Sequence, residues 1–236
     1  MPGADPSALA GWPGRLGEAA RRGWYWAADY RYVLARHRAW LRHPEVPPGY
    51  AHGELRPVVL IAGVMEPWVL LQPVADRLNA AGHPVHVVAD LAYNLAAVTE
   101  AARVVYRLVV ERDLREVVLV AHSKGGLIGK QLLAEDTEGR IDRLIAIATP
   151  FAGSALARFV PLRSIRTLRP RDATIRDLTA LVDLNARITS IYPSFDPHVP
   201  GGSHLAGATN IALPAMGHFR ILSDPAVLAA AVKAAG

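Results

Sequence analysis

From residue 56 onward, short apolar runs rich in β-branched residues alternate along the chain with longer amphipathic segments. This alternation is typical of parallel strands joined by helices that cover a sheet. The apolar runs predict six strands, at 57–62, 84–89, 116–121, 143–148, 187–192 and 209–213. The amphipathic segments predict helices at 68–81, 95–112, 125–135 and 225–233. We therefore expect an α/β fold, a mainly parallel six-stranded sheet with helices on both faces.

Two segments interrupt this alternation. Residues 1–55 contain four of the five tryptophans, interleaved with arginines, and residues 150–184 form a connection that is too long for a simple loop. Insertions of this length in compact domains are usually functional. We therefore expect an N-terminal, Arg/Trp-rich helical extension over 1–55 and a main domain over 56–236, in which 150–184 is a cap-like or lid-like insertion.

Aromatic and apolar residues recur near helical spacing between residues 23 and 42, at Trp26, Tyr30, Val33 and Trp40. This spacing predicts a helix that packs an apolar stripe on the main domain. A surface helix that docks on a membrane is the alternative. Interleaved aromatic residues and arginines also suit single-stranded nucleic acid, but a recognised RNA-binding pattern is missing, so we expect no nucleic-acid partner.

Composition narrows the chemistry and the location. The chain has no cysteine, which excludes disulfides, thiolate nucleophiles and zinc–cysteine sites. Arginine supplies almost all of the positive charge behind the net charge of +5, and we ascribe this bias to a GC-rich genome more than to an anionic partner. The first residues lack the pattern of a secretory signal, and no run approaches the ~20 apolar residues that span a bilayer. We expect a cytoplasmic location, with peripheral membrane contact through 23–42 as the alternative.

The most informative short pattern is an apolar run at 117–121 that leads through His122 to Ser123 and then into a predicted helix. A strand, a tight turn and a helix around a serine form a nucleophile elbow, which lifts the hydroxyl above the edge of the sheet. Neighbouring backbone passes close to the elbow, so small residues are needed two positions before and after the serine. Ala121 and Gly125 meet this need, and Ser123 is the expected nucleophile.

A serine hydroxyl becomes a good nucleophile only when a base takes its proton and an acid orients that base. In a sheet of this kind the acid and the histidine follow the serine along the chain, each after a strand. Asp196 follows the fifth predicted strand in a proline-rich turn, and His218 follows the sixth. They are the expected acid and base, with Asp172, Asp177 and Asp183 as alternatives for the acid.

Two backbone N–H groups usually stabilise the oxyanion of the tetrahedral intermediate. The N–H of Lys124, next to the nucleophile, is one candidate, and the N–H of Val64, after the first predicted strand, is the other. Loops at the carboxyl ends of the strands also form the binding site in such sheets. The resulting candidates for an apolar acyl pocket are Met65, Trp68, Phe151 and Leu156.

No metal or cofactor is needed for this chemistry. His198 and His204 are the nearest candidates for metal ligands, but two histidines without neighbouring acidic or cysteine ligands are a weak signal. His122 should point away from Ser123 and is expected to pack in the interior.

At these residues the sequence resembles the α/β-hydrolase superfamily, and more closely the small bacterial lipases and esterases with a minimal six-stranded sheet. The resemblance runs from about residue 57 to the C-terminus. It rests on the elbow at 121–126, the Asp196 turn, the Gly217-His218 pair and the segment that begins at Thr149. It implies a catalytic triad of Ser123, Asp196 and His218, with Val64 and Lys124 as oxyanion donors.

The sequence departs from the family pattern at two positions near the expected site. Ala62 stands where the family usually has a histidine, so the loop that positions Val64 lacks a supporting side chain. Lys124 stands where an uncharged residue is common. Its side chain either extends to water or attracts anionic substrates.

The function expected from these residues is that of a serine carboxylic-ester hydrolase, a lipase or esterase that acts through an acyl-enzyme on a small ester or lipid. An acyltransferase with the same triad is one alternative, because the two reactions differ only in the acceptor of the acyl group. A non-catalytic, membrane-associated scaffold that keeps the fold is the other.

Overall fold

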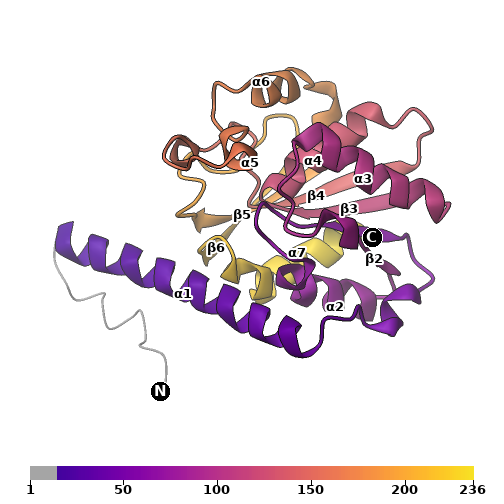
Figure 1. Ribbon diagram of the computed structural model, residues 1–236, viewed down its shortest axis with the longest axis horizontal. Helices are drawn as coiled ribbons and strands as arrows, with labels where there is room; N and C mark the ends of the chain where they lie inside the picture. Colours follow the sequence, from indigo (N-terminus) through magenta and orange to yellow (C-terminus); the bar gives the residue numbers. More distant parts are fainter. Residues whose placement is uncertain (1–14) are drawn as a thin grey trace.

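The computed structural model describes residues 15–236, and the side chains from Gly23 onward. Its six-stranded sheet has the order β2-β1-β3-β4-β5-β6, with every neighbouring pair parallel (Figure 1). The strands are β1 (Val58–Ile61), β2 (Val85–Val87), β3 (Val117–His122), β4 (Ile141–Ile147), β5 (Ile188–Phe195) and β6 (Thr209–Met216). The predicted parallel sheet of six strands is confirmed.

Helices cover both faces of the sheet, as predicted (Figure 1). The helices α2 (Gln72–Ala80) and α7 (Pro225–Ala235) lie on one face, and α3 (Val98–Glu111) and α4 (Lys124–Glu135) lie on the other. Two helix starts differ from the prediction by three residues or more. The segment at 68–81 begins with a 3₁₀ turn, η3 (Trp68–Leu71), and α3 begins three residues later than expected. The late start of α3 has a physical reason, because backbone carbonyls of the segment before it bind the ammonium group of Lys124.

The core consists of two apolar layers separated by the sheet. Alternate residues of each central strand point to opposite faces, so Val59 and Ile61 pack with α3 and α4 while Val58 and Leu60 pack with α2 and α7. All six residues of β3 are buried. Burial on both faces is typical of parallel sheets, and it fixes the end of β3, from which the elbow begins.

The N-terminal segment forms the long helix α1 (Arg15–Arg42) and the 3₁₀ turn η2 (Pro48–Ala51). In Figure 1, α1 runs along one side of the molecule, against η3 and the 3₁₀ turn η7 (Arg220–Ser223). Tyr25 and Asp29 of α1 are buried. Trp12 lies outside the described residues. None of the described helices is long and apolar enough to cross a membrane.

The segment between β4 and β5 contains short helical elements only. They are η5 (Ala155–Arg158), α5 (Arg163–Arg166), α6 (Ala173–Ala180) and η6 (Asp183–Arg187). A further 3₁₀ turn, η4 (Ala89–Leu91), follows β2. Figure 1 shows α5 near β5, with α6 farther from the sheet.

Candidate active site

Ser123 occupies the turn between β3 and α4 in a backbone conformation that few L-residues adopt, with φ 53° and ψ −124°. Its N–H donates to the carbonyl of Ile147 at 2.9 Å, which fixes the turn to β4. A Cβ atom on Gly125 would collide with the carbonyl oxygen of Ile61, which explains why a glycine stands there. Strain of this kind costs about 1–3 kcal/mol and is common at functional sites.

Asp196 and His218 come together at the ends of β5 and β6. His218 Nδ1 donates a hydrogen bond of 2.8 Å to Asp196 Oδ2, and both side chains are buried. The other carboxylate oxygen of Asp196 accepts the backbone N–H groups of His198 and Val199 at 2.8 and 3.0 Å. Asp172, an alternative acid in the sequence, instead caps α6 through the N–H of Thr174 at 3.0 Å. The structure therefore brings Asp196 to His218.

The electrostatics of this pair favour an ionised acid beside a basic imidazole. Burial alone raises the pKa of Asp196, but the charge of His218 and the hydrogen bonds to the carboxylate outweigh it and hold this pKa below its usual value. Burial alone lowers the pKa of His218, but the negative charge of Asp196, with smaller contributions from Glu66 and Asp29, keeps it above 6.5. His218 is thus arranged to accept a proton.

Ser123 and His218 line the same cavity, whose volume is about 600 Å³. Its wall is mostly apolar and aromatic, and none of the residues that line it is a lysine or an arginine. Within the described part of the chain, His218 Nε2 has no hydrogen-bond partner. Both groups that would exchange a proton during catalysis are therefore accessible from one apolar space.

The loop after β1 places a backbone N–H group beside the cavity. The N–H of Gly63 donates to Glu66 Oε2 at 3.0 Å, and that of Met65 donates to the carbonyl of Tyr93 at 2.7 Å. The N–H of Val64 has no acceptor among residues 15–236, and Val64 lines the cavity. The N–H of Lys124 belongs to the first turn of α4, where helical N–H groups lack partners within the helix. The two candidate donors thus border the space in front of Ser123.

Four residues were expected to form an acyl pocket, and the structure separates them. Met65 and Leu156 line the cavity. Phe151 is 5% exposed and packs in the core on the α3/α4 face, while Trp68 packs edge-on against Tyr50. Neither Phe151 nor Trp68 contributes to the cavity wall, because each packs against one of the two apolar layers beside the sheet.

The side chain of Lys124 neither extends to water nor faces the cavity, contrary to expectation. The residue is fully buried, and Nζ donates to the backbone carbonyl of Asn94 at 2.9 Å, to its side-chain oxygen at 3.2 Å and to the carbonyl of Ala96 at 2.5 Å. Burial lowers the pKa of Lys124 to about 8. The ammonium group neither reaches water nor faces a substrate, and instead fastens the loop before α3 to the start of α4.

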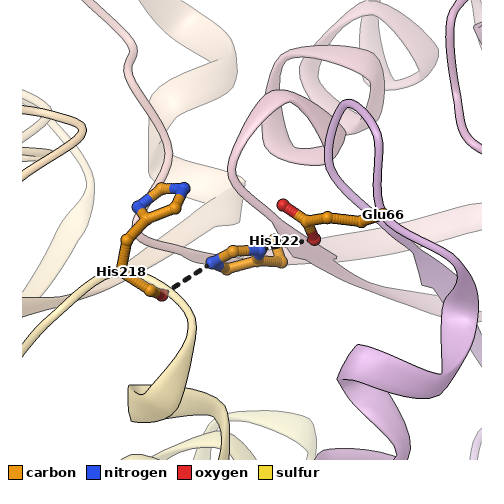
Figure 2. Close-up of side chains that lie close together, drawn as sticks. All are labelled: Glu66, His122 and His218. Atoms are coloured by element: carbon orange, nitrogen blue, oxygen red, sulfur yellow. Dashed lines mark hydrogen bonds and ion pairs between the residues drawn. The ribbon is translucent and has the colours of Figure 1, made fainter. Parts of the chain in front are cut away.

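Sequence reasoning missed Glu66, which provides the support that Ala62 lacks. Glu66 Oε2 accepts the N–H of Gly63 and is hydrogen-bonded to His122 Nδ1 at 2.7 Å (Figure 2). His122 Nε2 donates to the backbone carbonyl of His218 at 3.0 Å. A buried chain of contacts thus connects the loop of Val64 with the loop of His218. The signal in the sequence was an acidic residue just after the loop glycine.

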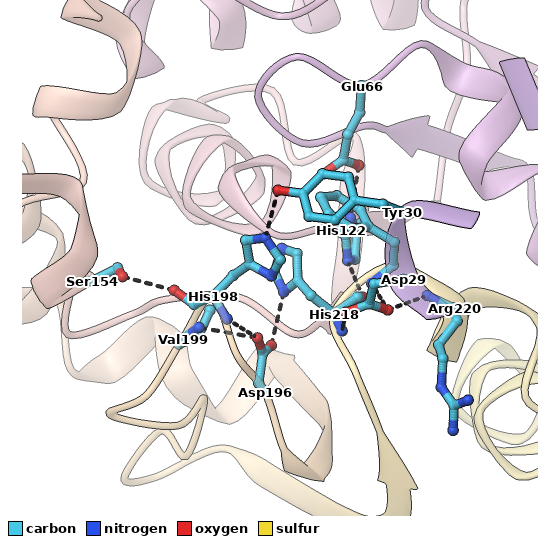
Figure 3. Close-up of polar contacts among 11 residues, drawn as sticks. Asp29, Tyr30, Glu66, His122, Ser154, Asp196, His198, Val199, His218 and Arg220 are labelled. Carbon is cyan, nitrogen blue, oxygen red and sulfur yellow. Dashed lines mark hydrogen bonds and ion pairs between the residues drawn. The ribbon is translucent and has the colours of Figure 1, made fainter. Parts of the chain in front are cut away.

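Asp29 is the second residue that the sequence did not reveal. It is fully buried, and its carboxylate accepts three successive backbone N–H groups, those of His218 at 2.7 Å, Phe219 at 3.1 Å and Arg220 at 3.0 Å (Figure 3). A Cβ atom on Gly217 would lie 2.6 Å from this carboxylate, and Gly217 has φ 107°. The glycine before His218 therefore leaves room for a residue that is distant in the sequence.

Two groups of side chains hold potential metal ligands within 4.8 Å of one another. They are Glu66 with His122 and His218, and Asp196 with His198 and His218. Each group contains a histidine–carboxylate hydrogen bond. Burial and the charge of His218 lower the pKa of His198 to about 3, so this imidazole is neutral. Neither group includes His204.

No protein-family model matches the sequence, and no curated protein is similar to it. Solved structures do match. An extracellular α/β-hydrolase from a Paenibacillus species is 17% identical, with a TM-score of 0.54, over 77% of this chain and 99% of that one. Lipase B from Aspergillus fumigatus is 19% identical, with a TM-score of 0.62, over 80% of this chain and 54% of that one.

A third match is BpoC from Mycobacterium tuberculosis H37Rv, described as a putative non-heme bromoperoxidase, which is 17% identical with a TM-score of 0.61 over 77% of this chain and 92% of that one. Identities this low establish the architecture and leave the activity to the residues of the site. The sheet, the elbow and these matches together show the α/β-hydrolase fold.

Proposed function

We propose that this chain, which has the α/β-hydrolase fold, is a serine carboxylic-ester hydrolase. One observation carries the proposal: the His218–Asp196 pair, with Nε2 of the imidazole free, lines the same cavity as a serine on a strained elbow. Lipases and a monoacylglycerol lipase are among the proteins of similar structure, which agrees with an ester as substrate.

The proposed reaction begins when Ser123 Oγ attacks the carbonyl carbon of the ester and His218 Nε2 takes the hydroxyl proton. Asp196 keeps the imidazole in the tautomer that accepts this proton, and stabilises the imidazolium that forms. The N–H groups of Val64 and Lys124 stabilise the oxyanion. His218 then returns the proton to the alcohol as it leaves, and the acyl group remains on Ser123.

Deacylation reverses these roles. A water molecule gives a proton to His218 and attacks the acyl carbonyl, and the carboxylic acid leaves as Ser123 recovers its proton. The low polarity of the cavity strengthens each electrostatic contact during both steps.

The cavity favours an uncharged, apolar acyl group. Its volume of about 600 Å³ is within the usual range of small-molecule sites, and Tyr93, Leu156 and Phe219 contribute apolar wall. A charged acyl chain would lose its hydration with no lysine or arginine side chain in the wall to replace it.

Labelling with a fluorophosphonate probe tests the activated serine, and a chain-length series of p-nitrophenyl esters tests the substrate class. We expect rapid labelling of the wild type and none of Ser123→Ala, with hydrolysis reduced at least ~10³-fold in the variant. A wild type that neither reacts with the probe nor cleaves any ester would support the scaffold alternative. Transfer of the acyl group to added alcohol in preference to water would indicate an acyltransferase.

Peripheral membrane contact through α1 is a separate proposal. Trp26, Tyr30 and Val33 face the cavity, whereas Leu34 and Leu41 are exposed on the same helix. Co-sedimentation of the full chain with anionic liposomes tests it, with the double variant Leu34→Ser and Leu41→Ser as the comparison. We expect weaker binding by the variant, and equal binding would remove α1 as the contact.

A further inference from the structure

The N-terminal helix α1 binds the backbone of the segment that carries the proposed base through the carboxylate of Asp29. Asp29 is the residue of α1 that reaches this segment with a charge, and it is completely buried there. Its two carboxylate oxygens accept the N–H groups of His218, Phe219 and Arg220, at the start of η7 (Figure 3). The backbone of residues 218–220 is therefore held in place by a residue that lies 189 positions before His218.

The same carboxylate contacts the backbone of His218, and burial raises the pKa of Asp29 against the opposing effect of the backbone hydrogen bonds and the charge of His218. No cation with a described side chain forms an ion pair with Asp29. The guanidinium of Arg220, whose backbone N–H binds Asp29, lies over the rings of Trp24 and Tyr25 at 5.3 and 5.5 Å. The only described hydrogen-bond donors to Asp29 are backbone N–H groups, which stabilise a carboxylate and do not neutralise it.

We propose that Asp29 is a positioning residue of the active site, which holds the His218 loop in place and supplies a second negative charge that stabilises the imidazolium formed during catalysis. This inference rests on the proposed ester-hydrolase function. It makes α1 an integral part of the site and not a detachable cover.

The surroundings of His218 agree with this role. Three carboxylates surround its imidazole, Asp196 from β5, Glu66 from the loop after β1 and Asp29 from α1, and all three raise the pKa of His218 against the effect of burial. Two further imidazoles face it, with ring centroids 4.7 Å away for His122 and 4.8 Å away for His198. His198 stays neutral, since its pKa is lowered to about 3.

The helix α1 also supports this face through its aromatic residues. The ring of Trp26 lies 4.5 Å from that of His198, and Tyr30 is hydrogen-bonded to His198 Nε2 at 3.4 Å. His198 in turn packs on His218. Asp29 fixes the backbone of the histidine while its neighbours in α1 hold the ring that covers it.

The test compares Asp29→Asn and Asp29→Ser, which remove the charge, with Asp29→Glu, which keeps it. The matched control is Asp224→Asn, because Asp224 also accepts backbone N–H groups, those of Ala226 and Val227, but at the start of α7 and away from the cavity. Two quantities are measured on the full chain: the titration of the His218 imidazole by ¹⁵N NMR, and kcat and KM for a p-nitrophenyl ester across pH.

We expect the two charge-free variants to lower the pKa of His218, since an anion that favours the imidazolium is lost. The acidic limb of the pH profile of kcat should then move to lower pH. We also expect kcat to fall about 10- to 100-fold, the loss expected when a catalytic group is misplaced, with KM nearly unchanged. Asp29→Glu is expected to keep the limb near its wild-type position, and Asp224→Asn to change neither quantity.

A folded Asp29→Asn or Asp29→Ser protein with an unchanged His218 titration and kcat would overturn the proposal. So would charge-free variants that lose kcat with no movement of the limb, because a purely structural role predicts that result. If neither charge-free variant folds, the proposal is overturned by an Asp29→Glu protein whose acidic limb of kcat is displaced from that of the wild type. The NMR titration needs no substrate, so an inactive wild type would contradict the proposed function alone.

Discussion

Two buried histidine–carboxylate pairs lie side by side at the carboxyl end of the sheet, and they differ in what the second ring nitrogen meets. His218 contacts Asp196 at 2.8 Å, and His122 contacts Glu66 at 2.7 Å. The ring centroids of the two histidines are 4.7 Å apart. Judged by distance and burial alone, either pair would qualify as a base with its orienting acid.

The second nitrogen separates the two roles. His122 Nε2 donates to the carbonyl of His218, so both nitrogens of His122 are engaged inside the protein. His218 Nε2 has no partner among the described residues, and its side chain lines the cavity with Ser123. A histidine–carboxylate pair becomes a proton acceptor only where one nitrogen remains available, whereas a fully bonded pair connects segments of the chain.

Removal of each histidine should give the largest contrast. We expect His218→Asn to reduce kcat/KM at least ~10³-fold, because no other group can take the serine proton. His122→Asn should cost about tenfold or less, through displaced loops. Steady-state kinetics with a p-nitrophenyl ester measures both, and circular dichroism confirms folding. Equal losses in the two variants would contradict the division of roles.

The two acids provide the next comparison. Asp196→Asn should lower kcat by about 10³- to 10⁴-fold, because an amide allows the imidazole to adopt the wrong tautomer. Glu66→Gln keeps an oxygen acceptor for Gly63 and should lower kcat by about tenfold or less. A Glu66→Gln enzyme as impaired as Asp196→Asn would mean that the His122 pair takes part in proton transfer.

Single and double replacements in the His122–Glu66 pair should differ in their effect on stability. His122→Leu leaves the Glu66 carboxylate buried without its partner, and we expect a loss of about 3 kcal/mol in the free energy of unfolding. The double variant with Glu66→Leu should recover part of this loss, because the unpaired charge is gone. Urea unfolding measures both chains, and a double variant no more stable than His122→Leu would argue against an interaction of this kind.

The pH dependence gives the smallest effect. The pKa of His218 lies above its ordinary value of 6.5, and the base must be neutral to accept a proton. The rate constant kcat/KM should therefore fall as the pH drops through a limb that lies above pH 6.5. A limb at or below this value would show that burial outweighs the surrounding carboxylates.

Much of the site was predictable because its pieces are local. The elbow at Ser123 needs small neighbours and a strand followed by a helix, and these are adjacent in the sequence. The order of serine, acid and histidine is likewise readable along the chain, although it left Asp172, Asp177 and Asp183 open as acids. In the structure His218 contacts Asp196, because β5 and β6 are neighbouring strands.

The remaining features depend on pairs of segments that are distant along the chain. The side chain of Lys124 was expected to extend to water or to attract anionic substrates, but the loop before α3 encloses it. Phe151 and Trp68 follow strand ends as expected for pocket residues, yet their directions were set by packing. No periodicity indicated that Glu66 would meet His122, or that Asp29 would meet the backbone of His218.

The sequence by itself determined the parallel sheet, the elbow and the candidate nucleophile, acid and base, since short-range patterns of apolar, small and turn-forming residues encode them. Only the tertiary structure decided which carboxylate serves which histidine, which nitrogen stays open and how α1 completes the wall of the cavity. The physical reason is distance: a hydrogen bond acts over about 3 Å, and packing across the sheet places those partners within that reach.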